Sequence, residues 1–374
     1  MSLVRTRLAA MPIVALLLSS GAVAQSYAAP PLPVPVGAVV AASGSPIAPA
    51  AASASRDDAV NKVLAISIDG LNPSAITKLG PKGAPTFYRL MREGSFTLNA
   101  RTEREQTRTL PNHTGMLTSR RIDDQHGGHG VTYNSDRGKT VHQAAGHYVS
   151  SVFDVVHDRG GSTALYTAKE KFKIYQRTWN TKGAKDKTGV NNGRKKIDRF
   201  VVDENNARLV AKLNTQLGTA PRVSTYTFLH ISLPDVYGHK YGFMSAKYLT
   251  AVKATDVLLG RVLNTVSRRP ALKKQLLVVL TADHGGYGAS HSKATSLQNF
   301  RVPFMAWGPG VPAGRNLYSI NPAFKDPKTA RTSYRGKQPI RNGDVANLST
   351  DALDLPKVPG SELNSSRKLT VFGR

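Results

Sequence analysis

The chain has 374 residues, 40% apolar and 20% charged, which is enough for a folded core and unlike a disordered chain. Its net charge of +27 indicates acidic partners, such as phosphorylated substrates, or else a generally basic exported protein. The sequence has no cysteine, which excludes thiolate nucleophiles and cysteine-ligated metals, and its scattered basic residues do not predict sequence-specific nucleic-acid binding.

The first residues are typical of an exported protein. A basic start and an apolar stretch end in AVA at 22–24, which predicts a secretory signal peptide at residues 1–24. A membrane anchor is the alternative, but the apolar run is short and contains Pro12. Residues 25–61 are rich in Ala, Pro, Ser and Gly and read as a flexible linker. We expect a secreted or extracytoplasmic protein, released or retained at the cell surface, with no later transmembrane segment.

From residue 62 to 374 the sequence predicts one catalytic domain in which strands alternate with helices. The expected strands are Val63–Ile68, Thr163–Thr167, Thr225–Leu233, Leu276–Leu280 and Pro303–Trp307. Helical patterns cover His142–His157 and Ser245–Val266. This alternation predicts an α/β fold with a mainly parallel central sheet and helices on both faces. The basic segment at about 175–200 is expected to be a surface insertion.

Three expected strands end in an acid, and three histidines follow nearby. The acids are Asp69, Asp235 and Asp283, and the histidines are His239, His284 and His291. One aspartate at such a position is ordinary, because aspartate suits turns and helix caps. Ligands of parallel sheets gather outside the carboxyl ends of the strands, so six oxygen and nitrogen donors there could form a two-metal site. This donor set without thiolate suits zinc, with manganese and iron as alternatives.

A hydroxyl nucleophile is suggested by the stretch TRTLPNHT at 107–114, which precedes a short helical pattern. A hydroxyl at a helix start lies where backbone N–H groups and the helix dipole attract anions. Thr109 would need a base or a metal to act as a nucleophile, and the stretch alone is only a helix-start signal.

The motifs SIDG at 67–70, RTLPNHT at 108–114, PDVYGH at 234–239 and TADHG at 281–285 together resemble the alkaline phosphatase superfamily. The similarity is greatest to its type I phosphodiesterase/nucleotide pyrophosphatase branch, in consistent order over about residues 62–364. The resemblance implies an alkaline-phosphatase-like α/β/α sandwich. It also implies a metal-dependent phosphoric ester hydrolase, of phosphodiesterase or phosphatase type, that acts on a small phosphate ester or nucleotide-like substrate.

The resemblance further implies two divalent metal ions, with Zn²⁺ favoured, and a phospho-threonine intermediate on Thr109. One ion would be held by Asp235, His239 and His291, and the other by Asp69, Asp283 and His284, with Thr109 directed toward it. Asn112 corresponds to a residue that hydrogen-bonds a phosphoryl oxygen in phosphodiesterase members. His291 departs from the family pattern, because a serine follows it where relatives commonly have glycine.

Several alternatives stay open on sequence alone. A sulfatase mechanism is disfavoured, because the chain lacks cysteine and has threonine at the nucleophile position. A catalytically silent basic domain that binds extracellular polyanions is the alternative function. We expect the lysines of AKEKF at 168–172 and Asp256 to face solvent, and His113 and His230 to be structural. The oligomeric state and the choice between mono- and diesters stay open.

Overall fold

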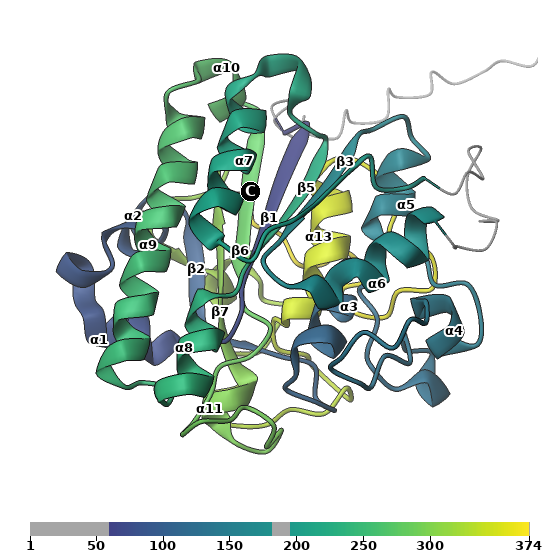
Figure 1. The fold of residues 1–374 in the computed structure, drawn as a ribbon, viewed down its shortest axis with the longest axis horizontal. Coiled ribbons are helices and arrows are strands. Elements are labelled where there is room, and N and C mark those ends of the chain that lie inside the picture. Colours follow the sequence, from purple (N-terminus) through teal and green to yellow (C-terminus); the bar gives the residue numbers. More distant parts are fainter. Residues whose placement is uncertain (1–59, 182–194, 374) are drawn as a thin grey trace, which may run out of the picture. The chain divides into compact units, whose positions relative to one another are not determined.

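The computed structural model describes residues 60–181 and 195–373. These residues form an α/β fold built on one eight-stranded sheet (Figure 1). The sheet order is β4 (Arg199–Val202), β3 (Thr163–Thr167), β5 (Tyr226–Ile231), β1 (Lys62–Ile68), β6 (Leu276–Thr281), β7 (Arg301–Trp307), β2 (Ser95–Arg101) and β8 (Arg315–Asn316). The five strands from β4 to β6 are mutually parallel. β7 is antiparallel to both of its neighbours, β6 and β2. The predicted α/β fold with a mainly parallel sheet is confirmed.

The central strands are covered on both faces. Every residue of β5 and β6 is buried, and β1 is buried after its first residue. β1 and β6 consist largely of Val, Ile and Leu, the composition expected of parallel strands between two helical layers, and β5 adds aromatic residues. The sequence patterns for these three strands were therefore strong.

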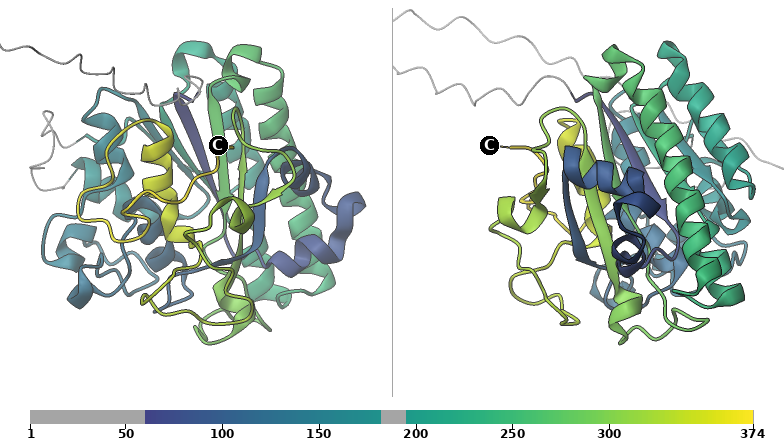
Figure 2. Two further views of the ribbon diagram at one scale, coloured as in Figure 1. Left: turned by 180° about the vertical axis from the view of Figure 1, so that it is seen from behind. Right: turned by 90° about the vertical axis from the view of Figure 1, so that its left-hand side faces the viewer.

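Two layers of helices enclose the sheet (Figure 2). One contains α1 (Pro73–Gly83), α2 (Pro85–Glu93), α7 (Asn206–Gly218), α8 (Leu233–Tyr241), α9 (Ala246–Ser267) and α10 (Pro270–Lys273). The other contains α3 (Thr109–Thr118), α5 (Val152–His157) and α13 (Val345–Ala352). Shorter helices are α4 (Val141–Ala145), α6 (Lys173–Gln176), α11 (Leu297–Phe300) and α12 (Leu317–Ile320). Within the described ranges, no helix has the length and apolar composition needed to span a bilayer.

Three expectations need correction. The helical pattern at 142–157 forms two helices, because Gly146 ends α4 with a φ of 73° and Ser151 begins α5 with a capping box. The expected insertion at 175–200 is too wide, since Tyr175 and Trp179 are fully buried in the core. Asp256 is also buried and does not face solvent. Residues 182–194, the expected signal peptide and nearly all of the expected linker lie outside the described residues.

Candidate metal centre

Three carboxylates meet at the carboxyl ends of β5, β1 and β6, which are neighbours in the sheet. Asp69 follows β1 directly, and Asp283 lies two residues after β6. Asp235 was expected at a strand end, but β5 stops at Ile231 and Asp235 occupies the first turn of α8. All three acids are buried, with exposed fractions of 0%, 3% and 0% for Asp69, Asp235 and Asp283.

Gly70 allows these carboxylates to approach one another. Its φ is +69°, and a Cβ added there would lie 2.9 Å from the Cα of Asp235. Any side chain would therefore clash with the start of α8 as well as strain the backbone. The Gly70 N–H donates to Oδ1 of Asp283 at 3.0 Å, which ties the end of β1 to the loop after β6.

Three histidines present the same ring nitrogen to this cluster. Because a carbonyl oxygen can only accept, the Nδ1 atom of each ring must donate its proton to the backbone carbonyl that it contacts. Each neutral ring therefore keeps Nε2 as an acceptor, which is the arrangement found in metal-ligating histidines. The pairs are His284 with Gly285 at 2.8 Å, His239 with Ala289 at 3.0 Å, and His291 with Thr107 at 2.6 Å.

The first expected ligand group is brought together by α8 and the loop after β6. α8 places Asp235 and His239 one turn apart, and Asp235 Oδ1 lies 3.4 Å from His239 Nε2. The same oxygen is 3.7 Å from His291 Nε2. The two Nε2 atoms are 3.0 Å apart although neither carries a proton in the neutral rings, so a cation between them would relieve the contact of two lone pairs.

The second expected group surrounds His284, whose Nε2 lies 3.1 Å from Asp283 Oδ2 and 3.5 Å from Asp69 Oδ1. The same Nε2 is 4.0 Å from Asp235 Oδ1. His284 therefore lies between the two groups, and the set Asp235, His284 and His291 also has the spacing of a metal site. The shortest contacts of His284 Nε2 are those with Asp283 and Asp69, which favours the expected grouping of these three residues.

Four of the six expected ligands have an atom without a hydrogen-bond partner inside the protein, which suits metal binding. The buried atoms without a hydrogen bond include Asp69 Oδ1, Asp235 Oδ1, Asp283 Oδ2, His284 Nε2 and Thr109 Oγ1. An unsatisfied buried polar group costs about 1–3 kcal/mol, so five in one place call for a ligand. Carboxylate oxygens and imidazole nitrogens without thiolate are a donor set for zinc.

The electrostatics of the cluster also suit cations. Burial and repulsion from Asp69 and Asp235 raise the pKa of Asp283 well above its usual value. Burial would raise the pKa of Asp69 too, but Lys169 and His230 hold it well below the usual value. Burial lowers the pKa of His284 and His291 and keeps both rings neutral, as ligation requires.

Thr109 is the first residue of α3, and contacts on both sides bring it to the cluster. Two residues before it, Thr107 accepts from His291. One turn after it, His113 Nδ1 lies 2.8 Å from the Thr109 carbonyl oxygen and 3.6 Å from Asp283 Oδ2. The hydroxyl of Thr109 is buried and has no hydrogen-bond partner, so it is available to an incoming group.

Asn112 is positioned differently from the expected phosphoryl-oxygen contact. Its Oδ1 accepts from Glu103 N at 2.9 Å and from Asn342 Nδ2 at 3.2 Å. Its Nδ2 donates to the carbonyls of Gln106 at 2.8 Å and Arg108 at 3.0 Å. The whole amide is engaged in fixing the loop before α3, which leaves no donor for a substrate.

Asn134 is a residue that the sequence reasoning missed. Its Oδ1 accepts the N–H of Leu110, next to Thr109, at 3.0 Å. The side chain is half-buried, and its Nδ2 has no partner among the described residues. It lies three residues after the sequence HGV at 129–131, and a wider reading of that stretch could have found it.

Lys169 was expected to be solvated, but it enters the cluster. Its Nζ lies 2.6 Å from Oδ2 of both Asp69 and Asp235. His230 Nε2 reaches the same oxygen of Asp69 at 3.0 Å, and its Nδ1 lies 3.1 Å from Thr167 Oγ1. His230 and His113 are therefore structural supports of the cluster, as expected.

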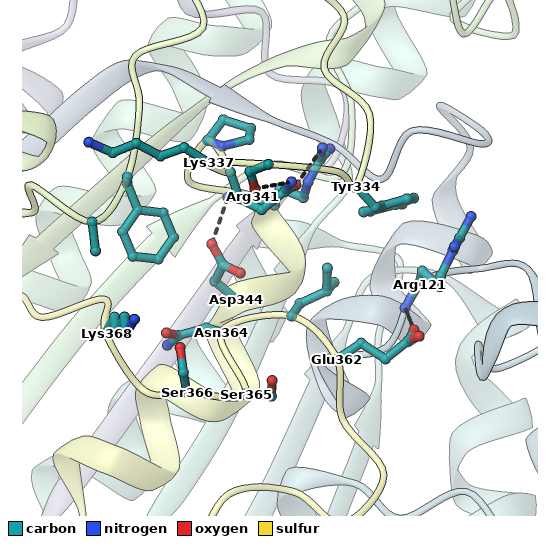
Figure 3. A pocket seen from close by; sticks show the side chains of 16 residues that line it. Arg121, Tyr334, Lys337, Arg341, Asp344, Glu362, Asn364, Ser365, Ser366 and Lys368 are labelled. Carbon is teal, nitrogen blue, oxygen red and sulfur yellow. Dashed lines mark hydrogen bonds between the residues drawn. The ribbon is translucent and has the colours of Figure 1, made fainter.

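A separate cavity of about 440 Å³ lies beside the loop that follows α12 (Figure 3). None of the expected metal ligands lines it. Tyr334 lies against the guanidinium groups of Arg121 and Arg341 and donates to Glu103. This cavity is distinct from the metal cluster. Its lining residue Arg341 is followed by Asn342, whose Nδ2 contacts Asn112 Oδ1 and the Asp283 carbonyl.

Comparison with known proteins agrees with this geometry. The type I phosphodiesterase/nucleotide pyrophosphatase family matches residues 63–323. The chain belongs to this family. The match begins at the second residue of β1 and includes every expected metal ligand together with Thr109.

The fold is similar to that of murine ectonucleotide pyrophosphatase/phosphodiesterase 5, with a TM-score of 0.57 and 14% identity over 83% of this chain and 100% of that one. An inactive threonine-to-alanine variant of the murine protein in complex with AMP gives a TM-score of 0.55 at 14% identity, covering 80% of this chain and 96% of that one. GPI ethanolamine phosphate transferase 1 of Yarrowia lipolytica is 34% identical over 92 residues, 23% of this chain. The chain spans only 9% of that relative and 14% of its Gibberella zeae counterpart.

Proposed function

We propose that the protein is a secreted two-metal phosphoric ester hydrolase, of phosphodiesterase/nucleotide pyrophosphatase or phosphatase type. The observation that carries the proposal is the cluster of unpartnered ligand atoms, together with the unpartnered hydroxyl of Thr109, whose helix start is tied to the cluster through Thr107 and His113. Asp235, His239 and His291 would hold one ion, and Asp69, Asp283 and His284 the other. Membership of the family and the inactive threonine variant of the murine neighbour support the choice of a threonine nucleophile.

The proposed reaction has two displacements. Two bound Zn²⁺ ions would supply positive charge for the phosphoryl oxygens and lower the pKa of the attacking hydroxyl. Thr109 Oγ1 forms a bond to phosphorus as the ester oxygen leaves, and water then cleaves phospho-Thr109 to restore the hydroxyl. The free Nδ2 of Asn134 and the amino terminus of α3 donate to a phosphoryl oxygen. In this proposal Asn134 replaces Asn112 in that role.

The remaining parts of the chain fit an exported enzyme. Residues 1–24 would direct secretion, 25–61 would form a linker, and 62–374 would form the catalytic domain. A net charge of +27 would attract anionic phosphate esters or nucleotide-like substrates. A silent polyanion-binding domain is less well supported, because such a domain has no need to keep unpartnered ligand atoms on Asp69, Asp235, Asp283 and His284.

The first test compares p-nitrophenyl phosphate with bis-p-nitrophenyl phosphate as substrates. Protein from residue 25 onward is assayed with zinc, beside Thr109→Ala and the control Thr250→Ala. Thr250 is an exposed residue of α9 whose hydroxyl contacts only its own helix. We expect two metal ions per chain, hydrolysis of one or both esters, and a loss of at least about 10³-fold in Thr109→Ala only.

The outcomes separate the candidate functions. The ratio of the two rates distinguishes a monoesterase from a diesterase. Metal binding without cleavage of either ester would contradict this substrate class, and absence of metal would favour the silent binding domain. Because the short curated matches are transferases, product analysis with an added alcohol acceptor shows whether the phosphoryl group passes to water or to the acceptor.

A further inference from the structure

Lys169 connects the two proposed metal groups. It follows β3, and its side chain is 15% exposed, with Nζ 2.6 Å from Asp69 Oδ2 and 2.6 Å from Asp235 Oδ2. Asp69 belongs to one ligand group and Asp235 to the other. One lysine therefore contacts a carboxylate from each group at the same time.

The lysine contacts one oxygen of each carboxylate and leaves the other free. Oδ2 of Asp69 and Oδ2 of Asp235 accept from Lys169, whereas Oδ1 of each acid has no hydrogen bond and faces the histidines. A carboxylate fixed through one oxygen cannot rotate freely about its terminal torsion. Lys169 thus orients the free oxygen of each acid toward the place that a metal ion would occupy.

The positive charge of Lys169 also compensates the negative charge of the carboxylates that it contacts. Asp69, Asp235 and Asp283 are buried close together, and burial keeps the His284 and His291 rings neutral. Of the described residues, Lys169 is the full cation that directly contacts these carboxylates. A group of buried carboxylates without a compensating cation is strongly destabilising. Before metal binds, the lysine supplies this compensation.

We propose that Lys169 is a positioning residue that acts as the internal counter-cation of the metal-free site. It keeps the ligand carboxylates in their metal-binding orientation until two metal ions take over most of the charge compensation. The inference rests on the proposed two-metal function. It requires that loss of Lys169 destabilise the metal-free protein more than the metal-loaded protein.

The test measures thermal unfolding with EDTA and with zinc for wild type, Lys169→Met, Lys169→Arg and Lys173→Met. Lys173 is an exposed lysine four residues away that pairs with Glu170 and serves as the matched control. We expect Lys169→Met to lower the Tm by at least about 5 °C in EDTA and by less than half of that in zinc. Lys169→Arg should recover most of the Tm in EDTA, and Lys173→Met should behave as wild type.

A second variant keeps the proposal testable if Lys169→Met does not fold in EDTA. Adding Asp235→Asn removes one buried negative charge, so the double variant should be more stable in EDTA than Lys169→Met alone. Equal losses of Tm in EDTA and zinc, or no stabilisation by Asp235→Asn, would overturn the proposal and leave Lys169 a packing residue. If zinc fails to raise the Tm of the wild type, the two-metal function fails instead, and the EDTA comparison still reports the charge effect.

Discussion

Two asparagines lie near Thr109, and their hydrogen bonds give them different roles. Asn112 makes four hydrogen bonds, two buried and two partly buried, that join the loop before α3 to Asn342. Asn134 makes one, to the N–H of Leu110, and its side chain is half-buried. Loss of Asn112 should therefore affect folding, and loss of Asn134 should affect catalysis.

Alanine variants of these residues separate the two roles. We expect Asn112→Ala to lower the free energy of unfolding by about 2–4 kcal/mol, because it leaves several buried groups unpaired. Asn134→Ala should cost less than about 1 kcal/mol and reduce kcat by about 10²-fold, as loss of an oxyanion donor does. Chemical denaturation and steady-state kinetics measure both quantities. The reverse pattern would return the phosphoryl contact to Asn112.

The residues of the site show what a sequence can reveal. Asp69, Asp283 and His284 follow buried strands, so their convergence was predictable from strand polarity. Lys169 reaches Asp69 across 100 positions of the chain. Its neighbourhood is a run of charged residues that usually indicates solvent exposure. The pairing of β3 with β5 places this run beside the cluster, and local sequence patterns do not predict which strands pair.

At the scale of single elements, the start of α2 depends on a carboxylate from another helix. α2 has no side-chain cap of its own. Asp256 of α9 accepts from the N–H groups of Thr86 at 3.1 Å and Phe87 at 2.8 Å. Helical periodicity gave α9 correctly, but it could not show that a second helix would begin against its acidic residue. This explains why the expectation of a solvent-facing Asp256 was wrong.

Replacing Asp256 tests this packing. Asp256→Ala leaves two N–H groups unpaired and removes a negative charge from the positive end of α2. We expect a loss of about 1–3 kcal/mol in the free energy of unfolding, with kcat unchanged, because the residue lies away from the metal cluster. The exposed Asp124→Ala is the control and should unfold as wild type does. A loss below about 0.5 kcal/mol for Asp256→Ala would show that water replaces the cap.

The sequence predicted some strands of the sheet and missed others. β1, β5 and β6 were expected because apolar residues dominate them, whereas β2 and β4 were missed. Along β2 buried and half-buried residues mix, and none of the four residues of β4 is buried. β4 lies at the edge of the sheet, where one side of the strand is unpaired and apolar residues are not required. Edge position thus removes the pattern that identifies central strands.

At the scale of the whole molecule, buried acids make stability depend on pH. Glu103 is completely buried: its N–H, in the loop before α3, donates to Asn112, and its carboxylate accepts from Tyr334, which lines the cavity of Figure 3. Burial raises the pKa of Glu103 to about 8, with Glu105 adding repulsion and Arg341 opposing the shift. Burial raises the pKa of Asp344 to about 7. Both carboxyls keep a proton in the folded protein at a pH where the unfolded chain has lost it.

The sign of the effect follows from proton linkage. Between the usual glutamate pKa near 4.3 and about 8, the folded state holds one more proton at Glu103 than the unfolded state does. The contribution of Glu103 to the free energy of unfolding is greatest below the usual glutamate pKa and decreases as the pH rises toward 8. Buried histidines such as His113, whose pKa is lowered by burial, act in the opposite direction below about pH 6.5. The contribution of Glu103 to this pH dependence is therefore isolated by comparing wild type with a Glu103 variant.

Glu103→Gln keeps a neutral side chain of the same size at every pH. Relative to wild type in EDTA, its free energy of unfolding should improve by about 1.4 kcal/mol for each pH unit between 5 and 7. Urea denaturation at several pH values measures this difference, with the exposed Glu204→Gln as a control that shows no such trend. A constant difference across this range would mean that Glu103 is already ionised in the fold. In that case Arg341, not a retained proton, would balance the buried charge of Glu103.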